Sequence, residues 1–201
     1  MKREGAPPLT TSPPNPDLLA RFEELLRTRA VPLGLISSSD AGRIHERHVL
    51  DSLRAVHCLR LTDRTLIDVG AGAGLPGIPV AIVEPERHVV LLEPGAKRAA
   101  FLELAVESLQ LANVEIRIAR AEDVGLKGDV CFARALAPPV RAWELIEGLL
   151  SRSGRLVYFA GRSWGRDPEA ELEARGVQVT VCDLAQFAWQ GPIVMMARTS
   201  Q

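Results

Sequence analysis

The sequence has few aromatic residues, only three cysteines and no long apolar run. Phe, Tyr and Trp make up 4% of its 201 residues, so aromatic surfaces for stacking single-stranded bases must be few. Cys58, Cys131 and Cys182 lie far apart without zinc-ligand spacing, and we expect three reduced packing residues and no metal site. No apolar run approaches the roughly 20 residues of a membrane span, and residues 1–8 lack the apolar core of a secretory signal. We therefore expect a cytoplasmic protein without membrane contact.

An excess of charge of one sign is also lacking. The chain has 24 Lys and Arg against 25 Asp and Glu, a net charge of −1. Bulk charge therefore does not indicate nucleic-acid binding, and an RNA site would have to be a local basic surface. With 47% hydrophobic and 24% charged residues, the composition is typical of a soluble globular protein of one domain.

Two helices are expected before anything that resembles a sheet. Residues 1–16 are rich in Pro, Thr and Ser, which predicts a mobile tail. Apolar residues recur at helical spacing over residues 16–30. A second helix is expected to begin at an N-cap within residues 38–40 and to run to about residue 59.

The remainder of the chain alternates strands and helices. Strands are expected at residues 65–69, 88–92, 114–119, 129–133, 154–159, 176–181 and 193–197, and a clear amphipathic helix at 96–111. This alternation predicts an α/β, Rossmann-like fold with a mostly parallel seven-stranded sheet and helices on both faces. We expect one domain over residues 17–201, in which an N-terminal helical extension (17–62) precedes the Rossmann-like core (63–201).

A glycine-rich turn follows the first expected strand, at the carboxyl end where open α/β sheets bind ligands. Gly72, Gly74 and Gly77 fit the dinucleotide fingerprint. Gly70, Gly72 and Gly74, preceded by Asp68, fit an S-adenosylmethionine loop instead. A carboxylate at Asp68 would repel pyrophosphate but suit the ammonium and sulfonium cations of S-adenosylmethionine. The second interpretation is therefore favoured.

Acidic residues follow the next two strands as well. Glu93 ends the second strand about 20 residues past the turn, where a carboxylate binds ribose hydroxyls in either cofactor class. Ala121, Glu122 and Asp123 follow the third strand, where methyltransferases use backbone and acidic groups for the adenine edge. The three sites are expected to converge on one crevice.

Basic residues gather on the second expected helix. Arg47, His48, Arg54 and Arg60 could bind RNA phosphates without reading sequence. Arg47 and His48 lie within one helical turn of Asp51, however, and could equally form a structural network with it.

Three further cations stand near the expected crevice. Arg134 ends the fourth strand, and because arginine matches the two acceptors on one edge of guanine, it could serve the cofactor, a guanine or both. Lys97 and Arg98 open a helix, the less favourable end for cations. They could contact ligand or RNA, or lie on a solvated surface.

Four stretches of the chain share residues, order and spacing with a known family. They are Arg47–Leu53, Asp68–Pro79, Lys97–Leu102 and Ala133–Ala135. Over about residues 17–198 the chain thereby resembles the RsmG (GidB) family of ribosomal RNA methyltransferases, and the extension Gly-Leu-Pro-Gly-Ile-Pro of its glycine loop is the most diagnostic piece.

The resemblance implies a cytoplasmic bacterial enzyme that transfers a methyl group from S-adenosylmethionine to nitrogen-7 of one guanine in 16S ribosomal RNA, free or in the small ribosomal subunit. We expect a monomer. It also implies that Gly70, Leu75, the Ala121–Glu122 pair and Arg134 contact the cofactor, and that Glu93 holds its ribose. Because nitrogen-7 has an in-plane lone pair, no general base is needed, and no catalytic side chain is expected.

Other functions remain open. These are a methyltransferase for a different RNA or a small molecule, a nicotinamide-dependent oxidoreductase (disfavoured by Asp68), and an S-adenosylmethionine-binding protein without turnover. The chain also departs from the family at Ala160, where the family usually has Lys before Gly; Arg162 lies close and could supply the cation.

The three tryptophans, Trp143, Trp164 and Trp189, are interpreted as packing residues. One of them could stack on a base, and the sequence does not indicate which.

Overall fold

The computed structural model describes residues 14–162, 164–182, 184–185 and 189–199. The tail expected at residues 1–16 lies almost entirely outside this range.

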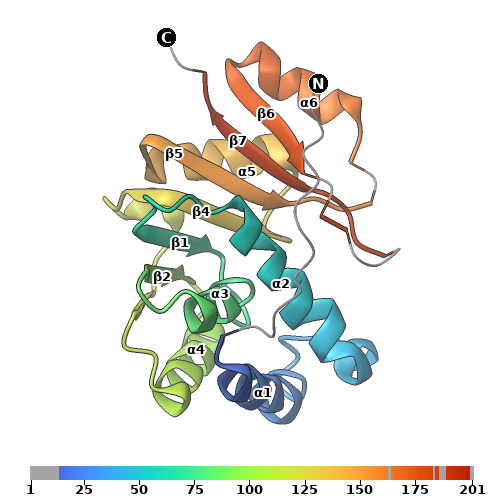
Figure 1. Cartoon of the computed structure of the whole chain (residues 1–201), viewed down its shortest axis with the longest axis vertical. Helices are drawn as coiled ribbons and strands as arrows, with labels where there is room; N and C mark the ends of the chain where they lie inside the picture. The colour runs from blue at the N-terminus through green and yellow to red at the C-terminus, as the bar shows by residue number, and fades with distance from the viewer. Residues whose placement is uncertain (1–13, 163, 183, 186–188, 200–201) are drawn as a thin grey trace.

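The described strands form one seven-stranded sheet in the order β3-β2-β1-β4-β5-β7-β6 (Figure 1). Their bounds are β1 Thr65–Val69, β2 His88–Leu92, β3 Val114–Arg117, β4 Gly128–Arg134, β5 Leu150–Phe159, β6 Val177–Cys182 and β7 Ile193–Arg198. β7 runs antiparallel to both of its neighbours, and the pairs from β3 to β5 are parallel. The predicted mostly parallel α/β sheet is confirmed.

Helices cover both faces of this sheet (Figure 1). They are α1 Pro16–Leu25, α2 Asp51–Leu53, α3 Gly77–Val83, α4 Ala96–Leu109, α5 Pro139–Ile146 and α6 Arg166–Ala174, with shorter helical turns between them. Successive strand residues point to opposite faces. Leu66 and Leu91 therefore pack with α1 to α4, and Ile67 and Val90 pack with α5 and α6.

The second expected helix differs from its prediction. Residues 38–58 are helical, but as a 3₁₀ turn (Ser38–Arg43), a π turn (His45–Leu50), α2 and a second 3₁₀ turn (Arg54–Cys58). Its N-cap is Ser37, whose hydroxyl accepts from the backbone N–H of Ser39. The expected single helix is therefore wrong, because apolar spacing cannot separate i+3, i+4 and i+5 bonding over so few turns.

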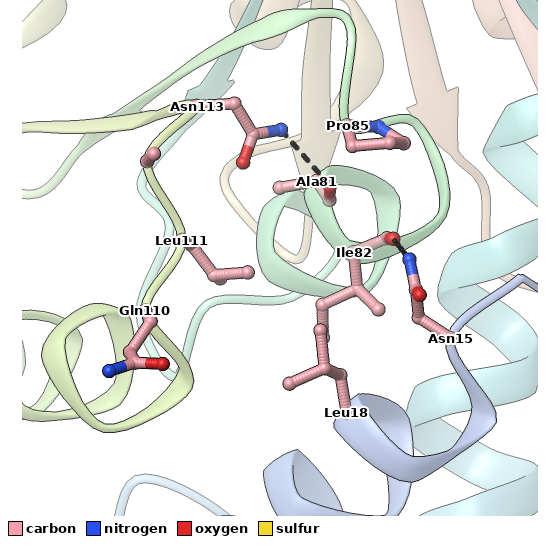
Figure 2. Close-up of a pocket in the computed structure, with 9 residues that line it drawn as sticks. Asn15, Leu18, Ala81, Ile82, Pro85, Gln110, Leu111 and Asn113 are labelled. Atoms are coloured by element: carbon pink, nitrogen blue, oxygen red, sulfur yellow. Dashed lines mark hydrogen bonds between the residues drawn. The ribbon is translucent and has the colours of Figure 1, made fainter.

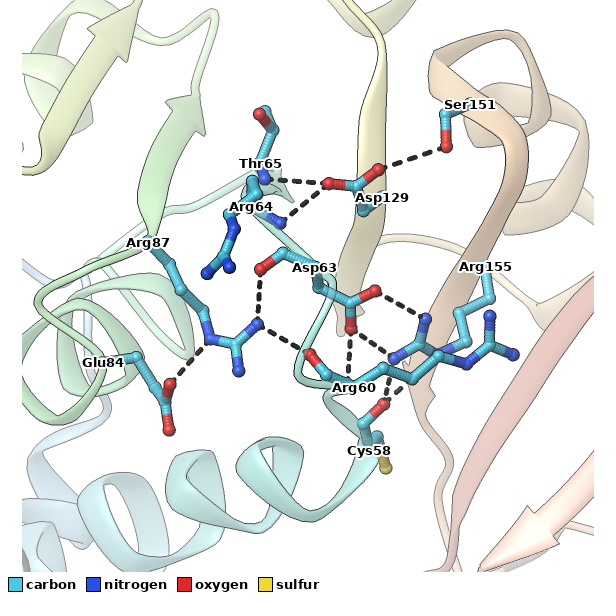
Figure 3. A network of polar contacts seen from close by, with 10 residues as sticks. All are labelled: Cys58, Arg60, Asp63, Arg64, Thr65, Glu84, Arg87, Asp129, Ser151 and Arg155. Carbon is cyan, nitrogen blue, oxygen red and sulfur yellow. Dashed lines mark hydrogen bonds and ion pairs between the residues drawn. The ribbon is translucent and has the colours of Figure 1, made fainter.

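A buried polar network joins this helical extension to the amino ends of the strands (Figure 3). The Arg155 guanidinium pairs with the Asp63 carboxylate at 2.6 Å and also donates to the Cys58 carbonyl. The backbone N–H of Arg60 donates to the same carboxylate, and Arg87 donates to the carbonyls of Arg60 and Asp63. Burial opposes ionisation of Asp63, but the hydrogen bonds from Arg155 and Arg60 outweigh it and lower the pKa of the carboxyl.

Candidate functional site

The glycine loop between β1 and α3 depends on residues without side chains. Gly70, Gly72 and Gly74 have φ values of +72°, +59° and +80°, a region that other residues rarely adopt. A Cβ on Gly70 would lie 2.8 Å from Cδ1 of Leu136, just past the end of β4. The loop therefore lies against the carboxyl ends of β1 and β4, and of its three glycines Gly72 alone has no side chain within 4 Å of an added Cβ.

Glu93, immediately after β2, braces this loop. Its side chain is buried; Oε2 accepts from the Gly72 N–H at 3.0 Å and Oε1 from the Gly95 N–H at 2.8 Å. Arg98 lies 3.5 Å from Oε1. Because a carboxylate has about four acceptor positions, these three contacts leave one for a further donor. The bond to Gly72 was not foreseen from the sequence, and the ribose role of Glu93 stays a prediction.

Asp68 lies beneath the loop and not on its surface. The residue is 1% exposed, and Oδ2 accepts from the Gly77 N–H at the start of α3 at 2.8 Å. Burial raises the pKa of Asp68 to about 7, although the Gly77 N–H and the Arg134 charge act to lower it. The direct contact expected with the cations of a ligand is therefore corrected: in this structure Asp68 contacts the loop.

This burial predicts a pH dependence of stability. Because the folded pKa of Asp68 is raised above its ordinary 3.8, its contribution is full below that value and is lost as the pH rises through about 7. Asp68→Asn keeps an acceptor for the Gly77 N–H but cannot ionise. Urea unfolding should therefore show the variant gaining stability relative to the wild type between about pH 5 and about pH 8. A difference that does not change with pH would contradict the raised pKa.

The other expected cofactor residues lie at the same edge of the sheet. Ala121 and Glu122 form a short 3₁₀ turn after β3 and follow Arg117, whose carbonyl accepts from the Glu93 N–H at 3.1 Å. Leu75 is half-buried in the glycine loop. The sites after β1, β2 and β3 thus share one edge, and their contacts with a cofactor stay predictions.

Arg134, at the end of β4, is held by the helical extension through one nitrogen. Its Nη2 donates to the Arg47 carbonyl at 2.9 Å, lies 3.3 Å from Nδ1 of His48 and pairs with Oδ2 of Asp51 at 3.2 Å. Among the described residues, Nε and Nη1 of Arg134 have no hydrogen-bond partner. Of the structural network suggested by the spacing of Arg47, His48 and Asp51, the side chains of His48 and Asp51 take part, and Arg47 takes part through its backbone carbonyl.

His48 is neutral in this cluster. Burial and the positive charge of Arg134 lower the pKa of His48 to about 4. With Arg134 as donor, Nδ1 is the acceptor, so the imidazole hydrogen is on Nε2, which lies 3.6 Å from Asp40. His48 therefore supplies no charge for binding phosphate at neutral pH.

Arg54 was expected on the RNA-binding surface and this expectation is wrong. Its side chain is 3% exposed and pairs with Asp51 at 2.7 Å. Nε and Nη2 donate to the carbonyls of Leu184 and Gly191. Since all of these acceptors are internal, Arg54 joins the helical extension to the connection between β6 and β7.

Arg60 is exposed, but it lies at the amino ends of the strands, opposite the carboxyl ends where the glycine loop lies. Its backbone belongs to the network at the amino ends of the strands (Figure 3), whereas Arg47 lies beside Arg134 at a carboxyl end. Arg60 follows Arg47 by thirteen positions along a chain that is helical as far as Cys58, a distance on the order of 20 Å. The structure therefore does not bring Arg60 to the crevice.

The remaining RNA candidates border the carboxyl edge. Lys97 and Arg98 begin α4 after β2, Arg162 follows β5, and all three are exposed. The Arg47 side chain is 38% exposed and pairs with Asp40 at 3.1 Å. Their contact with RNA stays a prediction.

A cavity of about 410 Å³ lies elsewhere, at the amino ends of β2 and β3 (Figure 2). Asn15 donates to the carbonyl of Ile82 beside it, and Asn113 donates to that of Ala81. None of its lining residues is ionisable, so no acid, base or charged side chain lines the cavity. Within the described part of the chain no cluster of His, Cys, Asp and Glu could hold a metal ion, and no helix is long and apolar enough to cross a membrane.

Most of the chain is similar in sequence to known proteins. A family model described as rRNA small subunit methyltransferase G (GidB) matches residues 15–190. A protein of Salinispora arenicola, named ribosomal RNA small subunit methyltransferase G, is 42% identical over 73% of this chain and 64% of its own length. One of the same name from Mycobacterium sp. (strain JLS) is 37% identical over 84% of this chain and 76% of its own.

Solved structures share the fold at lower identity. A putative O-methyltransferase from Klebsiella pneumoniae has a TM-score of 0.65 at 13% identity, over 96% of this chain and 93% of its own. A methyltransferase from Geobacter sulfurreducens has a TM-score of 0.60 at 17% identity, over 94% and 91%. These likenesses confirm the Rossmann-like methyltransferase fold.

Proposed function

The chain belongs to the rRNA small subunit methyltransferase G (GidB) family, and from this premise we propose that it transfers a methyl group from S-adenosylmethionine to nitrogen-7 of a guanine in 16S ribosomal RNA. The observation that carries the proposal is the position of Arg134, held through Nη2 at the carboxyl end of β4 beside the glycine loop. The proposal includes 16S RNA or the small subunit as partner, a cytoplasmic location and a monomeric enzyme.

The residues at the crevice fit S-adenosylmethionine, which supplies an electrophilic methyl group on a sulfonium. Gly72 has no side chain, and an added Cβ there would lie no closer to the protein than 3.7 Å, from the Gly70 carbonyl oxygen, so the loop leaves space beside Gly72 for an adenosyl or methionyl group. Glu93 keeps one acceptor position for a ribose hydroxyl.

Replacing Glu93 tests this assignment. Glu93→Ala should weaken binding of S-adenosylmethionine by about 1.5–3 kcal/mol, because charge-assisted hydrogen bonds are lost. This loss of affinity includes both the hydrogen bonds of Glu93 to the loop and the ribose contact. Calorimetry should therefore include the 2′-deoxy and 3′-deoxy analogues of S-adenosylmethionine. If Glu93 binds a ribose hydroxyl, the wild type discriminates against one analogue and the variant does not. Discrimination that survives in Glu93→Ala would reject the ribose role.

Arg134 suits recognition of guanine at oxygen-6. Nitrogen-7 must keep its lone pair free to attack the methyl group, so a donor on nitrogen-7 would block the reaction. Oxygen-6 can accept from Nε or Nη1 of Arg134, while adenine presents an amino donor at that place. Arg134 therefore favours guanine over adenine without occupying the reactive atom.

The remaining work of the site is positioning. An in-plane lone pair on nitrogen-7 attacks without prior loss of a proton, so no side chain has to act as a base. The ion pair of Arg134 with Asp51, 3.2 Å long, keeps the guanidinium in one place, and such fixed orientation contributes to rate.

The test is methyl transfer from radiolabelled S-adenosylmethionine to small ribosomal subunits, and to naked 16S RNA, from a strain that lacks this modification. Nucleoside analysis should recover the label as 7-methylguanosine. Label in another nucleoside, or no transfer by protein shown to bind the cofactor, would contradict the proposal.

A further inference from the structure

The three tryptophans differ in their relation to the carboxyl edge. Trp143 lies on α5 and is 5% exposed in the core. Trp164 packs against the same core, with its ring 6.3 Å from that of Tyr158. Trp189 is half-buried, and Cζ of Arg47 lies 5.6 Å from its ring centroid. It is the tryptophan that contacts a residue of the candidate RNA surface.

The residues that follow Trp189 are anchored to the candidate site. Gln190 donates to Oδ1 of Asp51 at 3.0 Å, and Oδ2 of the same carboxylate pairs with Arg134. Arg54 donates to the carbonyl of Gly191 at 2.6 Å. Asp51 thus connects the segment that carries Trp189 with the arginine at the end of β4.

Close backbone packing fixes this segment further. A Cβ on Gly191 would lie 2.2 Å from the carbonyl oxygen of Ala160, and the Ala160 N–H donates to the Pro192 carbonyl at 3.1 Å. Ala160 is the position where the family usually has lysine. In this chain the backbone there packs against the segment that follows Trp189.

We propose that Arg47 and Trp189 form a stacking platform for an unpaired base of the RNA substrate, beside the guanine that Arg134 contacts. This inference rests on the proposed function. A guanidinium plane and an indole ring are the two kinds of surface on which splayed-out RNA bases stack. The Arg47 side chain is 38% exposed and its carbonyl accepts from Arg134, so the platform adjoins the acceptor site.

The ligand is an unpaired base and not a duplex. An enzyme that modifies a base must reach it outside a helical stack, and stacking on a neighbouring base stabilises that open arrangement. Because every base has a π face, the platform adds affinity for single-stranded RNA with little sequence preference.

The test compares Trp189→Leu with Trp189→Phe and with the control Trp164→Phe in the full chain. Trp189→Leu keeps an apolar side chain but loses the ring, and should raise KM for the RNA substrate by roughly tenfold to a hundredfold. Trp189→Phe should retain most of the affinity. The affinity for S-adenosylmethionine and the thermal midpoint should stay at wild-type values in both.

Tryptophan fluorescence gives a second readout that does not need methyl transfer. A single-stranded guanine-containing oligoribonucleotide should quench emission in the wild type and in Trp164→Phe, and much less in Trp189→Phe. If the wild type methylates no RNA but this quenching is present, the proposed function fails and the platform stands. An unchanged KM for RNA in both Trp189 variants, with quenching equal to that of the wild type, would overturn the platform. An equal rise of KM in Trp189→Leu and Trp189→Phe together with a lowered thermal midpoint would also overturn it.

Discussion

Gly72→Val is expected to abolish binding of S-adenosylmethionine while the chain still folds. Gly72 has φ +59° and donates its N–H to Glu93. An added Cβ would meet no protein atom closer than the Gly70 carbonyl at 3.7 Å, so the valine methyl groups would extend into the space left open for the ligand. A β-branched residue at positive φ also costs on the order of 1–3 kcal/mol, which moves the loop backbone.

Gly176→Val is the matched control. Gly176 precedes β6, has φ +74°, and has nothing within 4 Å of an added Cβ. Its valine variant carries the same backbone strain at a place remote from the glycine loop. Calorimetry should find cofactor affinity lost in Gly72→Val and kept in Gly176→Val, with similar losses of thermal stability. Retained affinity in Gly72→Val would overturn the assignment of the loop.

The second large effect is expected at the buried pair of Asp63 and Arg155. Their side chains are 5% and 3% exposed and the ion pair measures 2.6 Å. Asp63→Ala leaves the Arg155 charge buried with only the Cys58 carbonyl to satisfy it, and the free energy of unfolding should fall by about 3–5 kcal/mol. Urea unfolding of the variant measures the loss, and a loss below about 1 kcal/mol would mean that the pair is not buried in solution.

A double variant separates charge burial from packing. Asp63→Ala with Arg155→Met removes both charges, and should recover a large part of the stability lost in Asp63→Ala alone. The pH dependence has a defined sign. Because hydrogen bonds lower the folded pKa of Asp63 below its unfolded value, its contribution is present above the unfolded pKa and is lost as the pH falls through the folded one. The difference between wild type and Asp63→Ala should therefore shrink in acid.

The strands could be predicted because their signals are local. Each of the seven begins and ends within four residues of its predicted bounds, since short apolar runs and the glycines and prolines beside them are properties of short segments. The glycine loop was recognisable for the same reason. Positive φ at Gly70, Gly72 and Gly74 is a requirement that the residue type itself expresses.

The helical extension shows where local signals end. The sequence predicted a helix from an N-cap within residues 38–40 to about residue 59, and it predicted Arg54 and Arg60 alike as surface cations. Only the packed structure separates them, because Arg54 meets acceptors from Asp51, Leu184 and Gly191, two of which lie more than 100 residues away.

The sequence by itself determined the sheet, the glycine loop and the family, because each is expressed by residue types at short spacing. The tertiary structure decided which polar groups face one another. It turned Asp68 under the loop, joined Glu93 to Gly72, and brought Trp189 to Arg47. These pairings depend on long-range packing, and a hydrogen bond between residues distant in sequence leaves no periodic pattern from which it could be read.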